Sequence, residues 1–376
     1  MSALHVLLSL TLAAAHAAAP APVPGSAAPA AASAVPSRAE LGRRALETVV
    51  SQLKNDDSDV RARAAEVLGY AGNPAAVPML KTMLSDRDKY VRIAASRSLW
   101  ELGNPSGLRT VFAIINDAPA QGPVANSPLV ELKVISQNKI REKAIEALAW
   151  MKGEKSSELL YKLKNDVSGT IRDAAARELA RLGRAEELAQ FTDALASEDE
   201  AVRYEGASVL GRICPAEAAG ALKDALSAET TVRVKMALLD ALACNPAAKE
   251  AEEQLLKLSE DANPTIKYKA VAALSGLRSQ KARARLMAVA DDQASDLRLK
   301  MTAQKGLMRS GAAPDVKTAG AALLSVRQEV QLEALDVISF FPDDEAAPLL
   351  QQGLADANVH VKLSSALQVL RRFSKK

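Results

Sequence analysis

The sequence predicts an all-α fold, an α-α superhelix (solenoid) of about ten helical hairpins. Three observations lead to this prediction. The 376 residues are 48% hydrophobic but only 3% aromatic, which is typical of Ala/Leu-rich helical proteins. One eight-position frame recurs along the chain at intervals of about 31 residues. Junctions made of Gly or Asn-Pro, such as Gly72 to Pro74 and Gly103 to Pro105, separate the repeats.

The recurring frame has an apolar residue at position zero, Arg or Lys next, a small or apolar residue at plus four and usually an apolar residue at plus eight. We place its ten copies at Val60, Val91, Ile140, Ile171, Val202, Val232, Ile266, Leu297, Val330 and Val359. Positions zero, four and eight lie on one stripe of an α-helix, so each copy predicts an amphipathic helix. An apolar segment just upstream, such as Ala75 to Leu84, predicts a second helix. A hairpin this short cannot bury both apolar faces alone, and stacking such hairpins gives a solenoid.

The residues before the repeats have a different composition. Val6 to Leu12 is a short apolar run that passes into an alanine-rich stretch with Ala-x-Ala sites. Residues 1–17 therefore predict a secretory signal peptide, the alternative being an Ala-rich leader. Residues 18–37 are rich in Pro and Ala, which predicts a linker, and the solenoid then spans 38–376. No later stretch approaches the roughly 18 apolar residues of a membrane-spanning helix, so we expect an exported, periplasmic or extracellular chain without stable membrane insertion.

The repeats resemble a known family. Segments such as Asp86 to Leu99 follow the pattern DxDxxVRxxAxxxL, close to the DxDxxVRxxAxxALG signature of HEAT repeats, and the short period is similar to the bacterial HEAT-like repeats seen in phycobilin lyases. Further turn acids are Asp166, Asp199, Asp261 and Asp292. The resemblance implies a ladder of hydrogen bonds between the turn Asp of one unit and the basic residue after position zero of another. It assigns this structural role to Arg61, Arg92, Arg141, Arg172, Arg203, Arg233 and Arg298.

One spacing breaks the period. The interval from Val91 to Ile140 is 18 residues longer than 31, which indicates an insertion near 116–130. Its turn formers predict a loop, and Ser127 and Pro128 can then start a long helix. Such a loop can serve as a binding element, but insertions at inter-helix turns are also cheaply tolerated.

A candidate binding row lies at position plus two, nearly opposite the predicted buried stripe. From the fifth copy onward this position is apolar, and basic residues flank it. The row and its flanking lysines are Tyr204, Val234, Lys235, Tyr268, Lys269, Leu299, Lys300, Leu332, Val361 and Lys362. If the second helices line the concave face, this row predicts a groove for an extended, acidic-flanked peptide or another polyanion. The alternative is that the row packs between adjacent second helices.

Aromatic and cysteine positions leave further alternatives open. Tyr70, Trp100 and Trp150 lie near the ends of second helices, either as interface anchors or as caps over the core. Cys214 and Cys244 occupy equivalent places in neighbouring copies, so they form either a disulfide or two buried free thiols. Equivalent atoms of stacked helices lie about 8 to 10 Å apart, beyond the ~7 Å limit of a disulfide, unless the helix ends converge.

Charge and motifs narrow the function. The formal net charge is only +3, which does not favour nucleic acid as a partner. The sequence has three histidines and no catalytic, nucleotide-binding or metal-binding motif, so we expect no catalytic residue, no metal and no cofactor. We therefore predict a non-enzymatic scaffold that binds a protein partner or extended peptide along its concave face. The alternatives are a HEAT-like enzyme of the chromophore lyase or DNA glycosylase type, if the leader is not a signal peptide, and a homo-oligomeric structural element.

Overall fold

The computed structural model describes residues 37–119 and 128–373. The chain divides into two units, Met1–Pro36 and Ser37–Lys376, and the fold described below is that of the second unit alone. The predicted signal peptide, nearly all of the predicted linker and the centre of the predicted insertion lie outside the described residues.

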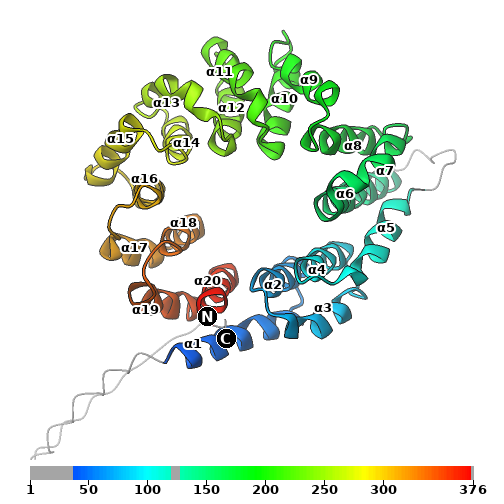
Figure 1. Ribbon diagram of the computed structural model, residues 1–376, viewed down its shortest axis with the longest axis horizontal. Coiled ribbons are helices and arrows are strands. Elements are labelled where there is room, and N and C mark those ends of the chain that lie inside the picture. Colours follow the sequence, from blue (N-terminus) through cyan, green and yellow to red (C-terminus); the bar gives the residue numbers. More distant parts are fainter. Residues whose placement is uncertain (1–36, 120–127, 374–376) are drawn as a thin grey trace, which may run out of the picture. The chain divides into compact units, whose positions relative to one another are not determined.

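The described residues form an all-α solenoid of ten hairpins, which confirms the predicted fold class and repeat count. The first helix of each hairpin lies in the outer layer (Figure 1). The outer helices are α1 (Arg38–Gln52), α3 (Val77–Met83), α5 (Leu108–Asn116), α7 (Ser157–Leu163), α9 (Ala185–Ala194), α11 (Ala219–Ala228), α13 (Glu252–Leu258), α15 (Gln280–Asp291), α17 (Val316–Leu323) and α19 (Asp343–Leu354). Short 3₁₀ turns precede five of them: η1 (Pro74–Ala76), η2 (Pro105–Gly107), η3 (Gly153–Ser156), η4 (Ala216–Ala218) and η5 (Ala248–Ala251).

The second helix of each hairpin carries the recurring frame and lies in the inner layer (Figure 1). The inner helices are α2 (Ser58–Tyr70), α4 (Lys89–Glu101), α6 (Pro128–Lys152), α8 (Gly169–Arg181), α10 (Glu200–Ile213), α12 (Val232–Cys244), α14 (Pro264–Leu274), α16 (Leu297–Arg309), α18 (Gln328–Ile338) and α20 (Val359–Phe373).

Local sequence explains where the inner helices begin and end. Asp57, Asp88 and Asp199 are N-caps, and each carboxylate accepts a hydrogen bond from the backbone N–H two residues later. Gly72 and Gly103 follow the first two inner helices in the left-handed region, with φ near +74° and +73°. Glycine adopts this conformation at low cost, so it ends the helix and turns the chain toward the next hairpin.

The solenoid closes on itself into a ring. Helices α1 and α20, at opposite ends of the repeat array, lie side by side (Figure 1). One continuous hydrophobic cluster joins Leu41 and Val49 of α1 to Val361 and Leu370 of α20. The terminal hairpins therefore cover each other's apolar faces, whereas an open array needs a separate polar cap at each end.

Polar contacts accompany this closure. The guanidinium of Arg38 donates to Asp344 at 2.7 Å and lies 5.6 Å from the ring centroid of Phe373. Arg372 donates to the carbonyl oxygens of Ile338 and Phe341, both at 2.9 Å. The basic C-terminal end of α20 thus covers the exposed carbonyls at the end of α18.

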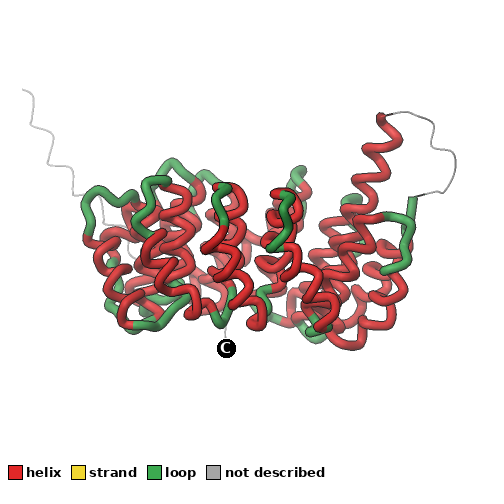
Figure 2. The backbone as a smooth tube through the Cα atoms, turned by 90° about the horizontal axis from the view of Figure 1, so that it is seen from above, coloured by secondary structure: helices red, strands yellow, loops and turns green. Residues whose placement is uncertain are grey.

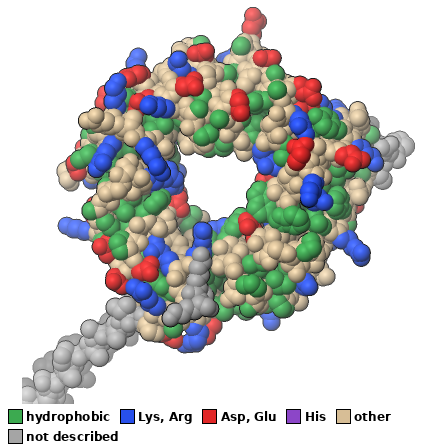
Figure 3. Space-filling view, viewed as in Figure 1, with side chains coloured by type: hydrophobic (Ala, Val, Ile, Leu, Met, Phe, Trp, Pro, Cys, Tyr) green, Lys and Arg blue, Asp and Glu red, His purple; other side chains and the backbone are tan. Residues whose placement is uncertain are grey.

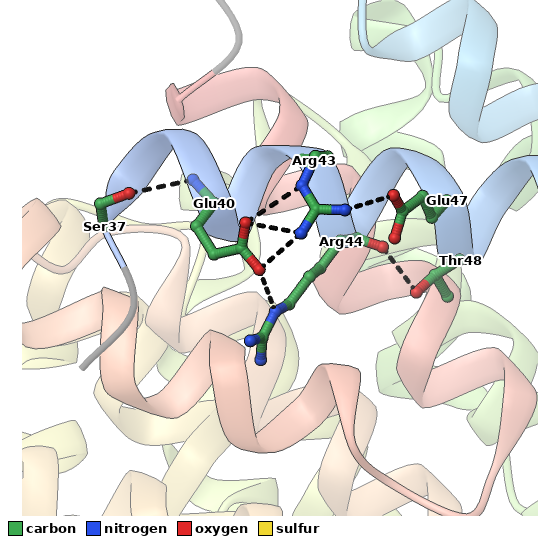
Figure 4. A network of polar contacts seen from close by, with 6 residues as sticks. All are labelled: Ser37, Glu40, Arg43, Arg44, Glu47 and Thr48. Atoms are coloured by element: carbon green, nitrogen blue, oxygen red, sulfur yellow. Dashed lines mark hydrogen bonds and ion pairs between the residues drawn. The ribbon is translucent and has the colours of Figure 1, made fainter. Parts of the chain in front are cut away.

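Helix α1 is also stabilised from within (Figure 4). Ser37 caps its first turn, and Glu40 accepts hydrogen bonds from Arg43 and Arg44, one turn further along. These hydrogen bonds, first that of Arg44, lower the pKa of Glu40 below its usual value. Ion pairs at this spacing favour an exposed helix, so α1 carries a regular polar face outside and an apolar face toward the closure.

The buried apolar residues form three clusters around the ring. At two of the boundaries one helix, α4 or α16, contributes buried residues to both clusters, whereas no helix does so between α8 and α10. Helices α8 and α10 also have few direct contacts with each other. We call this joint the α8–α10 seam.

Helix α6 is longer than the other inner helices, and its first turns project beyond the body of the ring (Figure 2). The projecting part carries Leu129, Leu132 and Ile135, each more than half exposed. The predicted long helix after Pro128 is therefore present.

Candidate functional site: the inner surface of the ring

The pattern of buried residues shows that position zero of the recurring frame was placed wrongly in three repeats. Val234, Leu299 and Val361 are buried, whereas Val232 is 45% exposed. Each of the three is followed by a lysine and has an apolar residue eight positions later, so each fits position zero. Position zero then falls at 202, 234, 266, 299, 330 and 361, with intervals of 31 to 33 residues.

The predicted apolar row is therefore wrong for these three residues. They pack between helices and present no surface to a partner. Tyr204, Tyr268 and Leu332 do stand at position plus two, where they are half-buried beside neighbouring inner helices. The predicted alternative, packing between second helices, describes the row better than an open groove.

The flanking basic residues are held in different ways. The Arg233 guanidinium stacks over the Tyr204 ring at 3.9 Å, and Arg298 stacks over Tyr268 at the same distance. Lys269 forms an ion pair of 2.5 Å with Asp240. The remaining lysines of the prediction, Lys235, Lys300 and Lys362, are half-buried at the position after zero.

The predicted arginine ladder is present in part. Arg61 donates two hydrogen bonds of 2.9 Å to Asp86 and also binds the carbonyl oxygens of its own turn. Arg141 donates to Asp166 at 2.7 Å, and Arg203 donates to Glu229 at 2.8 Å. Each acceptor stands 25 or 26 residues after its arginine, in the turn of the following unit.

The other four arginines lack this partner. Arg172 instead donates to the carbonyl oxygens of Asp166 and Val167 in its own turn, although Glu198 stands 26 positions later. For Arg92 the corresponding acid is Asp117, which pairs with Lys89. Arg233 and Arg298 stand one residue before position zero in the corrected frame, so they were misassigned.

Where the ladder forms, it changes the ionisation of the acids. Burial alone would raise the pKa of Asp86, but hydrogen bonds from Arg61 and from the Asp88 backbone lower it below its usual value. Arg141 acts in the same way on the pKa of Asp166. The hydrogen bond from Arg203 lowers the pKa of Glu229 to about 2. These carboxylates therefore remain ionised and form the ion pairs that join neighbouring repeats.

The inner surface surrounds an opening through the ring (Figure 3). Three pockets of about 340, 390 and 400 Å³ are lined by residues of the inner helices alone. The pocket of about 390 Å³ lies at the closure, between α2, α18 and α20. The pocket of about 400 Å³ lies between α10 and α12 and contains Tyr204 and Arg233.

The third pocket spans the α8–α10 seam, and we call it the seam pocket. Its lining includes Trp150 and five basic residues, namely Arg97, Lys143, Arg177, Arg181 and Arg212. The sequence prediction did not include this cluster, because the basic residues that it singled out were those beside the apolar row. The available signal was Arg at plus six or plus ten of neighbouring units, at Arg97, Arg177 and Arg212.

Cys214 and Cys244 are bonded, with their Cα atoms 5.6 Å apart. Of the two alternatives the disulfide is therefore present, and the ends of α10 and α12 converge as such a bridge requires. A Cβ at Gly211 would lie 3.4 Å from the Cα of Ala241, which shows how closely the two helices pack near the disulfide. Cys214 itself has a left-handed φ of 50°, which ends α10 just before Pro215.

The described ranges contain no group of three or more His, Cys, Asp or Glu side chains arranged to hold a metal ion. In residues 37–119 and 128–373, no helix combines the length and the apolar character required to cross a bilayer.

A family model described as HEAT repeats matches residues 46–126 and 157–243. The solenoid is built of HEAT repeats. No curated protein is similar enough in sequence to count as a relative of this HEAT ring.

Several solved structures are similar to this chain, at low sequence identity. An engineered protein is 20% identical, with 88% of this chain and 99% of that chain covered and a TM-score of 0.34. The complex of CpcE and CpcF of phycocyanin lyase from Nostoc is 17% identical, with 70% and 94% covered and a TM-score of 0.38. The karyopherin Kap121p bound to the SUMO protease Ulp1p is 16% identical, with 87% and 41% covered and a TM-score of 0.36.

Proposed function

We propose that the HEAT ring is a non-enzymatic scaffold, exported from the cytoplasm, that binds a protein partner or an extended acidic peptide on its inner surface. The observation that carries this proposal is the set of three inner-surface pockets, each formed by adjacent inner helices and each containing arginine. A partner in the opening can contact several repeats at once, which gives a large interface without a deep cleft in any single repeat.

The mixed character of this surface favours a protein over nucleic acid. Tyr204 and Met236 lie beside Arg212 and Asp240 in the pocket between α10 and α12. Interfaces with proteins combine aromatic, apolar and arginine contacts, whereas binding to a phosphate backbone depends on a uniformly basic surface.

Four aspartates at helix starts and turns, Asp57, Asp292, Asp343 and Asp344, support a structural rather than a catalytic role. Asp57 caps α2, and Asp292 accepts a hydrogen bond of 2.9 Å from the Ala294 backbone. Asp343 and Asp344 pair with Arg372 and Arg38, respectively, at the ring closure. Each of these carboxylates already has a partner that explains its position.

Export is supported by the predicted signal peptide together with the disulfide. Disulfides persist in the periplasm and outside the cell but are rare in a reducing cytosol. N-terminal sequencing of the protein recovered from a cell fraction tests this part: a start near residue 18 in an envelope or secreted fraction is expected. An intact Met1 in the cytosol would contradict export and would restore the alternative of a HEAT-like enzyme.

Site-specific photo-crosslinking tests the binding face. A photoreactive amino acid at Ser208, in the pocket between α10 and α12, should crosslink to the partner in intact cells. The matched control is Asp224, an exposed residue of outer helix α11. A third position, Ile135, reports on the projecting end of α6. Crosslinks at Asp224 or Ile135 without one at Ser208 would contradict binding on the inner surface.

A further inference from the structure

The seam pocket carries more positive charge than the ring itself neutralises. Its lining has five basic side chains against two acidic ones, Glu146 and Glu178. Lys143 pairs with Glu146 at 2.9 Å, and Arg181 pairs with Glu178 at 2.7 Å. Glu142, which lies beside the pocket, approaches Arg177 at 3.0 Å and Arg212 at 3.6 Å. With Glu142 included, the cluster still has a formal charge of +2.

Some of the guanidinium donors in this cluster have no acceptor among the described residues. Arg177 is only 5% exposed, and its Nη2 atom is buried without a hydrogen-bond partner. The Nη2 atom of Arg181 is likewise buried without a hydrogen-bond partner. A buried donor without a partner is destabilising, so an added acceptor at this site would be bound favourably.

Arg97 is a further hydrogen-bond donor at the pocket, and it pairs with no carboxylate among the described residues. Its guanidinium lies 4.8 Å from the Trp150 ring centroid and forms no ion pair within the described part of the chain. A stacking contact of this kind is weaker than a charge-assisted bidentate hydrogen bond to a carboxylate. Arg97 can therefore turn toward an anion at modest cost, and Trp150 would report that movement.

We infer that the seam pocket binds a carboxylate side chain of an acidic peptide and so anchors the partner across the α8–α10 seam. This inference rests on the proposed binding of a partner at the inner surface and adds the chemistry that one part of that surface recognises. The planar forks of Arg97, Arg181 and Arg212 match the geometry of a carboxylate.

The neighbouring surface favours a peptide over a free phosphate or a nucleic acid. Arg212 belongs both to the seam pocket and to the pocket between α10 and α12, so the two are continuous. The second pocket offers Tyr204, Met236 and Ala237 to an apolar side chain. A chain of phosphates would instead meet Glu146, Glu178 and Asp240, which repel it. A peptide that alternates acidic and apolar side chains complements both pockets.

Trp150 provides the measurement. The chain has two tryptophans, and Trp100 packs against the core outside the pocket. A Trp100→Phe protein therefore has fluorescence from Trp150 alone. We would titrate it with an octapeptide of alternating Glu and Leu, with the Gln/Leu octapeptide and with inorganic phosphate, at low salt. The Glu/Leu peptide should give a saturable change in Trp150 emission, and the other two probes should not.

Substitutions then locate the site. In the same single-tryptophan protein, Arg181→Gln with Arg212→Gln should weaken Glu/Leu peptide binding at least tenfold. Both residues are partly exposed, with side-chain exposures of 28% and 57%, so the variant should fold, which circular dichroism checks. The matched control is Arg309→Gln, another inner-helix arginine beside an aromatic ring, at 6.0 Å from Phe340. The control should bind the peptide as the parent does.

Each other outcome overturns the inference. No emission change with the Glu/Leu peptide, or equal weakening by Arg309→Gln, excludes a carboxylate site at the seam. Saturable binding of phosphate at least as tight as that of the peptide shows a general anion site. These results leave the crosslinking at Ser208 unaffected, so failure of this inference is distinguishable from failure of the proposed function.

Discussion

At the scale of single residues, the joints between HEAT repeats differ in whether the basic residue of the frame pairs with an acid 25 or 26 positions later. An acid there, such as Asp166 after Arg141, gives a buried ion pair with charge-assisted hydrogen bonds. Arg172 instead donates to carbonyl oxygens of its own turn, although Glu198 stands 26 positions later. At this last joint, between α8 and α10, no helix contributes buried residues to the apolar clusters on both sides.

Arg141→Met should be strongly destabilising because it leaves Asp166 without its arginine partner in a nearly buried site. Removing one member of a buried pair costs about 3–5 kcal/mol. Urea unfolding at pH 7 measures the loss. The control is Arg92→Met at the same frame position, where no acid is paired, and its cost should stay below about 1 kcal/mol. Equal effects of the two variants would contradict a ladder made by acid partners.

The low pKa of Glu229 predicts a defined pH dependence. Its pKa is about 2 in the ring against 4.5 in the unfolded chain, chiefly because Arg203 donates a hydrogen bond to it. A depressed carboxylate pKa stabilises the fold above the unfolded pKa, and this contribution disappears as the pH falls from about 4.5 to about 2. The Glu229→Gln variant should therefore be less stable than the parent at pH 7, by on the order of 3 kcal/mol at most.

Urea unfolding of the parent and of Glu229→Gln across this pH range tests the prediction. The difference in unfolding free energy should shrink steadily below pH 4.5. A difference that is constant from pH 7 to pH 3 would show that Glu229 acts through packing and not through its charge.

At the scale of elements, the sequence predicted the hairpins and their number but placed three frames two residues too early. Segments such as VRVKMALL and LRLKMTAQ contain two overlapping matches, each an apolar residue followed by Arg or Lys. The pattern alone does not choose between them. The structure shows that the later match is correct, because Val234 and Leu299 are buried. With this match the intervals between repeats become nearly uniform. The apolar row and the assignment of Arg233 and Arg298 to the ladder both arose from the earlier match.

The disulfide between α10 and α12 predicts a stability that depends on reduction. It closes a loop with a sequence separation of 30 residues, for which chain entropy gives a stabilisation of roughly 3–4 kcal/mol. The Cys214→Ser, Cys244→Ser double variant should therefore unfold at a lower urea concentration than the oxidised parent. Reductant should lower the parent to the level of the variant and leave the variant unchanged. A parent that is insensitive to reductant in urea, with two titratable thiols before treatment, would contradict the bridge.

At the scale of the whole ring, closure follows from small rotations between successive repeats, which the period of a sequence does not encode. The sequence showed amphipathic units but not the curvature that brings α1 to α20. It also gave no sign that the weakest joint lies inside the array. The chain ends share one continuous cluster, while the α8–α10 seam combines a break in the core, a gap in the ladder and a cluster of basic side chains. Local opening should therefore begin at the seam rather than where the chain ends meet.

Closure predicts that damage to α1 is transmitted to α20 at the other end of the array. Leu41 is buried in the cluster shared by these two helices, whereas Leu46 of the same helix is 39% exposed. Leu41→Ala should cost about 2–5 kcal/mol and should speed hydrogen exchange in residues 359–373, because the cavity lies against that helix. Leu46→Ala should cost below about 1 kcal/mol and should leave exchange there unchanged. A different outcome would contradict closure: Leu41→Ala speeds hydrogen exchange in α1 and α2 but leaves α20 fully protected. In that case the two ends of the array do not meet in solution and the solenoid is open. Each terminal hairpin must then be capped on its own.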